Sequence, residues 1–305
     1  MTRGMVTWMC RYPGGAVGTV VLGAIVVLAL LAPWVSPHGS REKAGGVYER
    51  PSWSLPLGLD DAGTDMVTLL LWGARTSLLV GFAAALIAVV VGGTVGLLAG
   101  YVGGKTDAVL MRITDYMLVI PDIPLLLIVA TVWGRSLTSV ILIIGLLSWA
   151  RLARVVRSEA MSMRERAYVR RALTIGAGAF RVITQHVLPH VVPLLLTLAI
   201  FAVGNAILVE TAIAFLGLGD PSAISWGRLI QNAFAGQAVS RGAWWAIVPP
   251  GLAVGALILS CTLIGRALEE KLNPRLRTGH LSVHSFRVAR LPVDGRLTSR
   301  TGKRM

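Results

Sequence analysis

Residues 76–102 read TSLLVGFAAALIAVVVGGTVGLLAGYV, a run of 27 residues without a single Asp, Glu, Lys or Arg. A helix needs about 20 mostly apolar residues to cross the roughly 30 Å of hydrocarbon in a bilayer. Backbone N–H and C=O groups inside lipid must be hydrogen-bonded within the spanning segment, and an α-helix does this without a partner strand. We therefore predict a transmembrane helix over residues 76–102.

Five other apolar runs have the same character: residues 16–35, 108–133, 137–156, 189–216 and 244–266. The run 108–133 is the weakest, because Arg112, Asp115 and Asp122 interrupt it. Hydrophobic residues make up 54% of the chain, charged residues only 14%, and mean hydropathy is +0.70. An ordinary soluble domain has about 25% charged residues. The sequence therefore predicts an all-α polytopic membrane protein with six transmembrane helices.

Basic residues fall unevenly between the two sides of this arrangement. With the N-terminus inside, 22 of the 29 Lys and Arg lie on the cytoplasmic side. Cytoplasmic loops are enriched in Lys and Arg, so this pattern predicts that both termini are cytoplasmic. The net charge of +14 then reflects topology, and no soluble domain remains to bind nucleic acid. A cleaved signal peptide at 16–35 would put the basic loop and basic tail on opposite sides, so we favour an uncleaved first span.

The longest basic loop contains residues 170–189, RRALTIGAGAFRVITQHVLP. We predict a short helix over 164–175, in which Tyr168, Ala172 and Ile175 share a face at i, i+4 and i+7. Gly176 ends this helix, because glycine adopts the left-handed cap conformation without strain. The second arm, 179–188, leads to Pro189, which suits the first turn of the fifth span.

The loop has a distinctive spacing: Arg170-Arg171-Ala172, three residues, Gly176, nine residues, His186, one residue, Leu188-Pro189. This spacing resembles the EAA loop of ABC importer permeases. The resemblance implies that the loop 157–189 is a cytoplasmic coupling loop that binds an ATPase. Arg170 and Arg171 replace the Glu and first Ala of the family pattern, so the partner surface is expected to differ. The implied coupling residues are Arg166, Tyr168, Arg170, Arg171, Ala172, Gly176, Leu188 and Pro189.

The resemblance extends over about residues 55–275. Three segments are similar to segments of the C-type permeases of dipeptide, oligopeptide and nickel importers. They are LPLGLDDAGTDM at 55–66, ILVETAIAFLGLGDPSAISWGRLI at 207–230 and LEEKLNPRL at 268–276. Leu59 and Thr64 depart from that pattern. The resemblance implies the type I ABC importer permease fold in a multi-pass protein of the bacterial cytoplasmic (inner) membrane.

The same resemblance implies the partners: a second permease subunit, as a heterodimer, two ATPase subunits or domains, and an extracytoplasmic solute-binding protein. ATP and Mg²⁺ would be bound by the ATPase partners, and no cofactor by this chain, which is not itself expected to be an enzyme. Peptides are the favoured substrate, with nickel or another small solute as an alternative. An ATP-independent channel or carrier would leave the 164–189 loop unexplained, and an intramembrane enzyme would need a nucleophile or metal cluster that the sequence lacks.

The acidic residues inside the predicted spans are Asp115, Asp122 and Glu210, and Asn205 lies five residues before Glu210. Such residues are costly in lipid and usually face a cavity or a partner. One interpretation is that they line a translocation path. The other is that each makes a hydrogen bond between helices, and Asp122, between Pro121 and Pro124, is expected at a kink.

Two motifs are misleading. Residues 99–106 satisfy a relaxed phosphate-loop pattern, but a lipid-spanning helix replaces the strand that the motif needs. His186 and His190 have metal-ligand spacing, yet Val187 stands where a metalloprotease needs Glu and Pro189 interrupts the turn. No metal site is predicted.

These observations divide the chain into three parts. Residues 1–74 contain the first helix and an outer loop, and residues 75–276 form the core permease domain of five helices. Residues 277–305 form a basic, disordered cytoplasmic tail, either a solvated extension without a role or a segment that touches anionic membrane lipid.

Overall fold

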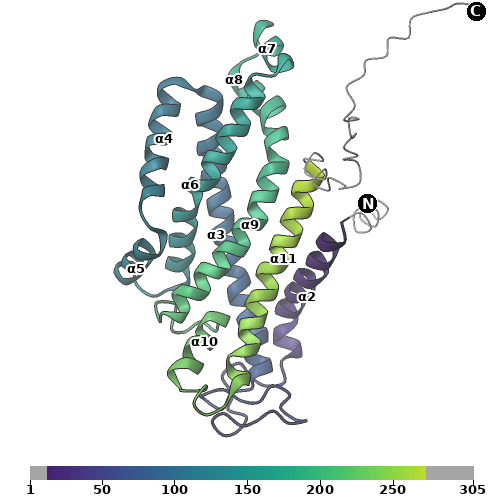
Figure 1. Cartoon of the computed structure of the whole chain (residues 1–305), viewed down its shortest axis with the longest axis vertical. Helices are drawn as coiled ribbons and strands as arrows, with labels where there is room; N and C mark the ends of the chain where they lie inside the picture. The colour runs from purple at the N-terminus through teal and green to yellow at the C-terminus, as the bar shows by residue number, and fades with distance from the viewer. Residues whose placement is uncertain (1–11, 273–305) are drawn as a thin grey trace, which may run out of the picture.

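The computed structural model of the chain describes residues 12–272, and its regular elements are helices (Figure 1). Across this part of the chain the extended pairings are two isolated bridges, Lys43 with Thr64 and Leu59 with Asp65. The all-α class is confirmed. The predicted tail 277–305 and the start of the predicted segment 1–74 lie outside the described residues.

Five helices are long and apolar enough to cross a membrane. They are α2 (Pro13–Val35), α3 (Met66–Val102), α6 (Leu137–Arg164), α9 (Leu188–Phe215) with its N-terminal extension from Ala179, and α11 (Val248–Leu272). They contain or largely overlap five of the six predicted runs. The lengths and apolar composition of these helices therefore agree with the predicted multi-span class.

The predicted span over 108–133 contains a sharp bend. This run lies in α4 (Gly104–Val119) and α5 (Asp122–Trp133), and the two helices meet at 94°. Ile120 precedes Pro121 and has ψ 127°, since the proline ring excludes the helical conformation of the residue before it. Asp122 therefore begins a new helix at the bend, as its flanking prolines predicted. The span count is five, or six if this bent pair crosses as one unit.

Helix α3 packs along α6 with a glycine at every fourth position. A Cβ at Gly92, Gly96 or Gly100 would come within 2.5 Å of a backbone oxygen of α6. Small residues at this spacing let two membrane helices approach closely. The α3–α6 pair is consequently a rigid centre on which the other helices pack.

The bundle has two distinct ends (Figure 1). One, the α7 end, carries α7 (Ala167–Thr174), α8 (Ala179–Val182) and the π-helical turn η1 (Ile183–Val187). The other, the α10 end, carries residues 36–65, α10 (Trp226–Ala235) and the 3-10 turn η2 (Trp244–Ala246). The predicted N-in, C-in topology would make the α7 end cytoplasmic.

The segment 55–66 is an ordered, turn-rich segment that leads into α3. Asp60 Oδ1 accepts hydrogen bonds from the backbone of Ala62 at 2.9 Å and Thr64 at 2.7 Å. Asp65 caps α3 by accepting from the backbone N–H groups of Val67 and Thr68. Leu59 is fully buried, and Trp245 donates to its carbonyl at 3.1 Å.

Candidate functional site: the 164–189 loop and the polar residues of the bundle

The loop helix is shorter than predicted. Arg164 is the last residue of α6, and α7 spans Ala167–Thr174 instead of 164–175. The carbonyl of Arg166 starts α7 by accepting from Val169 N at 3.0 Å and Arg170 N at 3.1 Å. Only two residues therefore separate the long helix α6 from α7.

Gly176 ends α7, as predicted, and it does so in a Schellman motif. Its φ is +87°, its N–H donates to Leu173 O, and Ala177 N–H donates to Ala172 O, both at 3.0 Å. These two bonds satisfy carbonyls that the helix end would leave unpaired. A Cβ at position 176 would meet nothing within 4 Å, so the requirement for glycine there is conformational.

The buried face of α7 consists of Val169 and Ala172. They pack in a core with residues of α3, α6 and α9 and with Val182 and Val187 of the second arm. Of the predicted face, Ala172 is buried, but Tyr168 is 41% exposed and Ile175 is 86% exposed. The sequence prediction missed Val169, Val182 and Val187, whose signal was their apolar spacing around a charged segment.

The outer side of the loop combines exposed apolar and basic groups. Ile175 and Phe180 are 86% and 81% exposed and lie on either side of Gly176. Arg170 pairs with Glu165, while Arg171 lies exposed on α7. This surface has a fixed shape because its inner side is packed.

Pro189 lies in the first turn of α9, as predicted, but the helical structure of the fifth span begins earlier. Helical structure begins at Ala179 and runs through η1 into α9, where Leu188 N–H donates to Ile183 O, five residues back. Pro189 has no N–H, and its ring would clash with the carbonyl four residues earlier in a regular α-helix. A π-helical turn before Leu188-Pro189 accommodates this proline.

Three ion pairs join the bent helices α4 and α5 to α6. Arg157 donates to Asp107 at 2.6 Å, Arg154 to Asp115 at 2.6 Å, and Arg151 pairs with Asp122. Asp107 and Arg157 are the least exposed of these side chains, at 19% and 31%. We call these three pairs the ion-pair ladder. The sequence prediction named Asp115 and Asp122 but did not find their arginine partners.

Asp122 and Asn205 line one cavity of about 240 Å³, together with Ser148 and Arg151. A second cavity of about 690 Å³, lined by Glu159, Arg166, Pro189, His190 and Glu269 among others, lies toward the α7 end. Val155, Leu198 and Phe201 line both, so the two spaces adjoin. We call them together the α6–α9 cleft.

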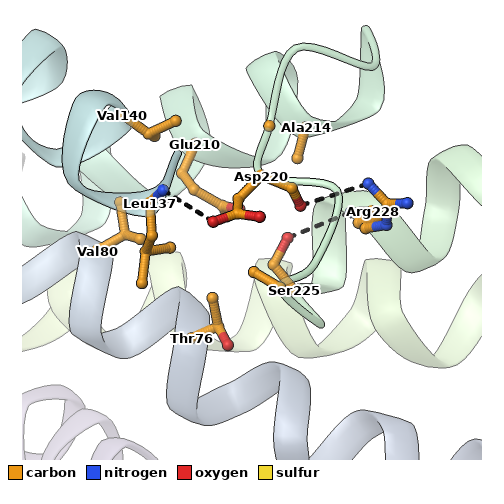
Figure 2. A pocket seen from close by; sticks show the side chains of 11 residues that line it. Thr76, Val80, Leu137, Val140, Glu210, Ala214, Asp220, Ser225 and Arg228 are labelled. Carbon is orange, nitrogen blue, oxygen red and sulfur yellow. Dashed lines mark hydrogen bonds between the residues drawn. The ribbon is translucent and has the colours of Figure 1, made fainter. Parts of the chain in front are cut away.

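Glu210 lies apart from this cleft. It is buried, and Ser77 Oγ of α3 donates to it at 3.4 Å while accepting from Trp226 N at 3.4 Å. Figure 2 shows Glu210 beside Asp220, Ser225 and Arg228. The cavity between these residues has a volume of about 10 Å³. That is room for about one water molecule. The space is too small for a peptide.

The two predicted path residues Asp115 and Glu210 are thus not brought together with Asp122 and Asn205.

His186 and His190 lie near Tyr168, with ring centroids 6.1 and 5.9 Å away. In residues 12–272, no group of three His, Cys, Asp or Glu residues could hold a metal ion.

These features define a class: a multi-span helical membrane protein with a rigid, packed loop at one end and a polar cleft leading toward it. Residues 92–278 match the family described as the binding-protein-dependent transport system inner membrane component. The chain belongs to this family and is a permease subunit of ABC importers, a multi-pass protein of the bacterial inner membrane.

Several relatives are similar over most of their length. A putative peptide transport system permease protein of Brucella abortus is 35% identical, covering 88% of this chain and 90% of the relative. The di/tripeptide transport system permease protein of Pseudomonas aeruginosa is 33% identical, with 86% and 89% covered. The oligopeptide transport system permease protein of Haemophilus influenzae is 29% identical, with 88% and 86% covered.

Proposed function

We propose that this permease forms half of the translocation path of a peptide importer and couples it to ATP hydrolysis on separate subunits through residues 164–189. The complete transporter contains a second permease, two ATPase subunits or domains and an external solute-binding protein. The chain itself carries no catalytic residue in this proposal. Peptides are favoured because the similar permeases named above are described as peptide, di/tripeptide and oligopeptide transport proteins.

The observation that carries the coupling proposal is the two-sided character of the loop. Its inner side is fixed by buried Val169 and Ala172, and its outer side exposes Ile175 and Phe180 beside Arg171. Apolar side chains held in a fixed shape at a loop tip suit a groove on a soluble partner. Because α6 runs into α7 after two residues, a rigid-body motion of that partner would tilt α6.

The ion-pair ladder extends this motion to α4 and α5, since its three arginines all lie on α6. Charged side chains this exposed are unfavourable against lipid and normally face water or another protein. We therefore propose that the ladder face and the α6–α9 cleft border the path. Asp122 and Asn205 line it, whereas Asp115 maintains the ladder and Glu210 stabilises the bundle.

Gly176 offers a sharp test of coupling. Gly176→Val places a β-branched residue at a φ of +87° without any clash, while Gly176→Asn keeps a residue that tolerates this conformation. The left-handed conformation costs a residue with a Cβ about 1–2 kcal/mol. That cost corresponds to a loss of about 5- to 30-fold in the docking-competent population.

We expect the valine variant to lose ATP-driven peptide uptake in proteoliposomes and to co-purify with less ATPase, and the asparagine variant to retain both. Both variants should insert into the membrane normally. Normal uptake by the valine variant would contradict the coupling role. ATP-driven uptake of nickel but not of peptides would retain the coupling role and replace the substrate.

A further inference from the structure

A groove between α2 and α3 has the character of a lipid site. Its volume is about 590 Å³, and its walls include Leu30 of α2 and Leu79 and Phe82 of α3, all of them exposed. Ala29 and Leu78 form its buried floor. In a membrane, such a groove opens toward the hydrocarbon of the bilayer.

The groove is polar only at one end. Arg75 and Trp72 line that end, with the guanidinium 5.1 Å from the indole ring centroid. Within residues 12–272, no carboxylate lies within ion-pair distance of Arg75. Arg75 lies in the third turn of α3, which begins at Met66, and it is the last charged residue before the uncharged run 76–102, so it marks the boundary of the most apolar part of this helix. Trp and Arg are typical of that boundary.

The groove matches an amphiphile in length as well as in polarity. Arg75 and Phe82 are separated by about two helical turns, or roughly 10 Å along the axis. One leaflet supplies about half of the roughly 30 Å of hydrocarbon. A headgroup phosphate at Arg75 would therefore direct an acyl chain along Leu79 and Phe82 within a single leaflet.

We propose that this groove binds a phospholipid with an anionic headgroup, held by Arg75 and Trp72, with its acyl chain between α2 and α3. A helix of another subunit would fill the apolar part but, unless it carried an acid at this level, would leave the guanidinium unpaired. The surroundings also favour lipid, because α2 is the least buried span. Of the most apolar stretch of 18 residues in each span, 22% is buried in α2 and 33–50% in the other four. Figure 1 places α2 at the edge of the bundle. The proposal rests on the multi-span fold and not on ATP coupling.

The test uses the full-length chain in nanodiscs of equal phosphatidylglycerol and phosphatidylcholine, with bound lipid counted by native mass spectrometry after release. We expect the wild type to retain about five times as much phosphatidylglycerol as phosphatidylcholine. One basic side chain near an anionic surface contributes roughly 1 kcal/mol, which corresponds to this ratio. Arg75→Gln should abolish this preference. Arg135→Gln, an exposed arginine just before α6, should keep it.

Leu79→Trp fills the groove and should lower retention of both lipids, and Leu86→Trp is its matched control. Leu79 and Leu86 are 54% and 64% exposed on the same helix, so both variants should fold. Wild-type retention by both Arg75→Gln and Leu79→Trp would overturn the proposal. So would a complete transporter that retains as little lipid as Leu79→Trp while the isolated chain retains it, because a partner helix would then occupy the groove.

Discussion

At the scale of single residues, Asp220 shows how one loop residue after α9 can link α6 and α10, through its carboxylate and its backbone carbonyl. Its Oδ2 accepts from Leu137 N at the start of α6, at 3.0 Å, and its Oδ1 accepts from Ser222 N at 2.7 Å. Its carbonyl accepts from Arg228 of α10, at 3.4 Å. Burial alone would raise the pKa of Asp220, but the hydrogen bonds from Ser222 and Leu137 outweigh it and hold the pKa below the ordinary 3.8.

The sign of this shift gives a pH prediction. Because the folded pKa is lowered, the ionised carboxylate contributes stability above the unfolded pKa, and this contribution is lost as the pH falls through the folded pKa. Asp220→Asn should cost about 1 kcal/mol at pH 7, after allowance for its partial exposure. Thermal unfolding of the two chains in detergent should converge in acid. A difference that stayed constant from pH 7 to pH 3 would contradict the assignment.

Glu210 gives a second prediction at this scale. Glu210→Gln keeps an acceptor for Ser77 and should leave thermal stability nearly unchanged, whereas Glu210→Ala leaves the buried serine without its acceptor and should cost about 1–3 kcal/mol. Peptide uptake should stay near the wild-type level in Glu210→Gln and should fall in Glu210→Ala in proportion to its loss of stability. If Glu210→Gln changed peptide uptake while unfolding at the wild-type temperature, Glu210 would belong to the path after all.

At the scale of elements, the bent pair α4–α5 depends on charge for much of its attachment. Thr114 is the buried residue of α4, and the apolar anchors of α5 are Leu126 and Ala130. The ion-pair ladder supplies three further links to α6. Stability should consequently be more sensitive to charge here than in the α3–α6 pair.

A charge swap tests the ladder. Asp107→Asn should lower the free energy of unfolding by about 1.5 kcal/mol, since it removes a charge-assisted hydrogen bond from a partly buried pair. Asp115→Asn should cost less than about 1 kcal/mol, because both members of that pair are half exposed. Asp107→Arg with Arg157→Asp should recover most of the loss of Asp107→Arg alone. No recovery in the double variant would show that the pair contributes nothing.

Element boundaries also show where sequence reasoning succeeded. Hydropathy located five spans because long uncharged runs have few alternatives to a spanning helix, and Gly176 was predicted from its freedom at positive φ, which the structure confirms. The bend at Ile120 and Pro121 and the π-helical turn before Pro189 depend on how proline is accommodated locally. A hydropathy count averages over such local geometry.

The candidate site was only partly predictable for a related reason. The coupling-loop residues follow from spacing along the chain, whereas the arginine partners of Asp115 and Asp122 lie about 30–40 residues away and depend on how α4, α5 and α6 pack. The shared cavity of Asp122 and Asn205 is likewise a product of tertiary structure.

At the scale of the whole molecule, the two ends of the bundle present different surfaces. The α7 end exposes Phe180 at 81% beside basic residues, and the α10 end exposes Phe234 of α10 at 62%. In the proposed transporter, the ATPases dock at the first end and the solute-binding protein at the second. A substitution at one end should therefore leave the partner at the other end bound.

ATPase co-purification with the tagged chain from membranes tests the central claim most directly. Phe180→Glu places a charge on the proposed docking surface, and Phe234→Glu makes the same change at the opposite end. We predict that the ATPase is lost with Phe180→Glu, by about fivefold or more as expected for an interface anchor worth over 1 kcal/mol, and kept with Phe234→Glu. Equal retention by both variants, or equal loss from both, would contradict docking at residues 164–189.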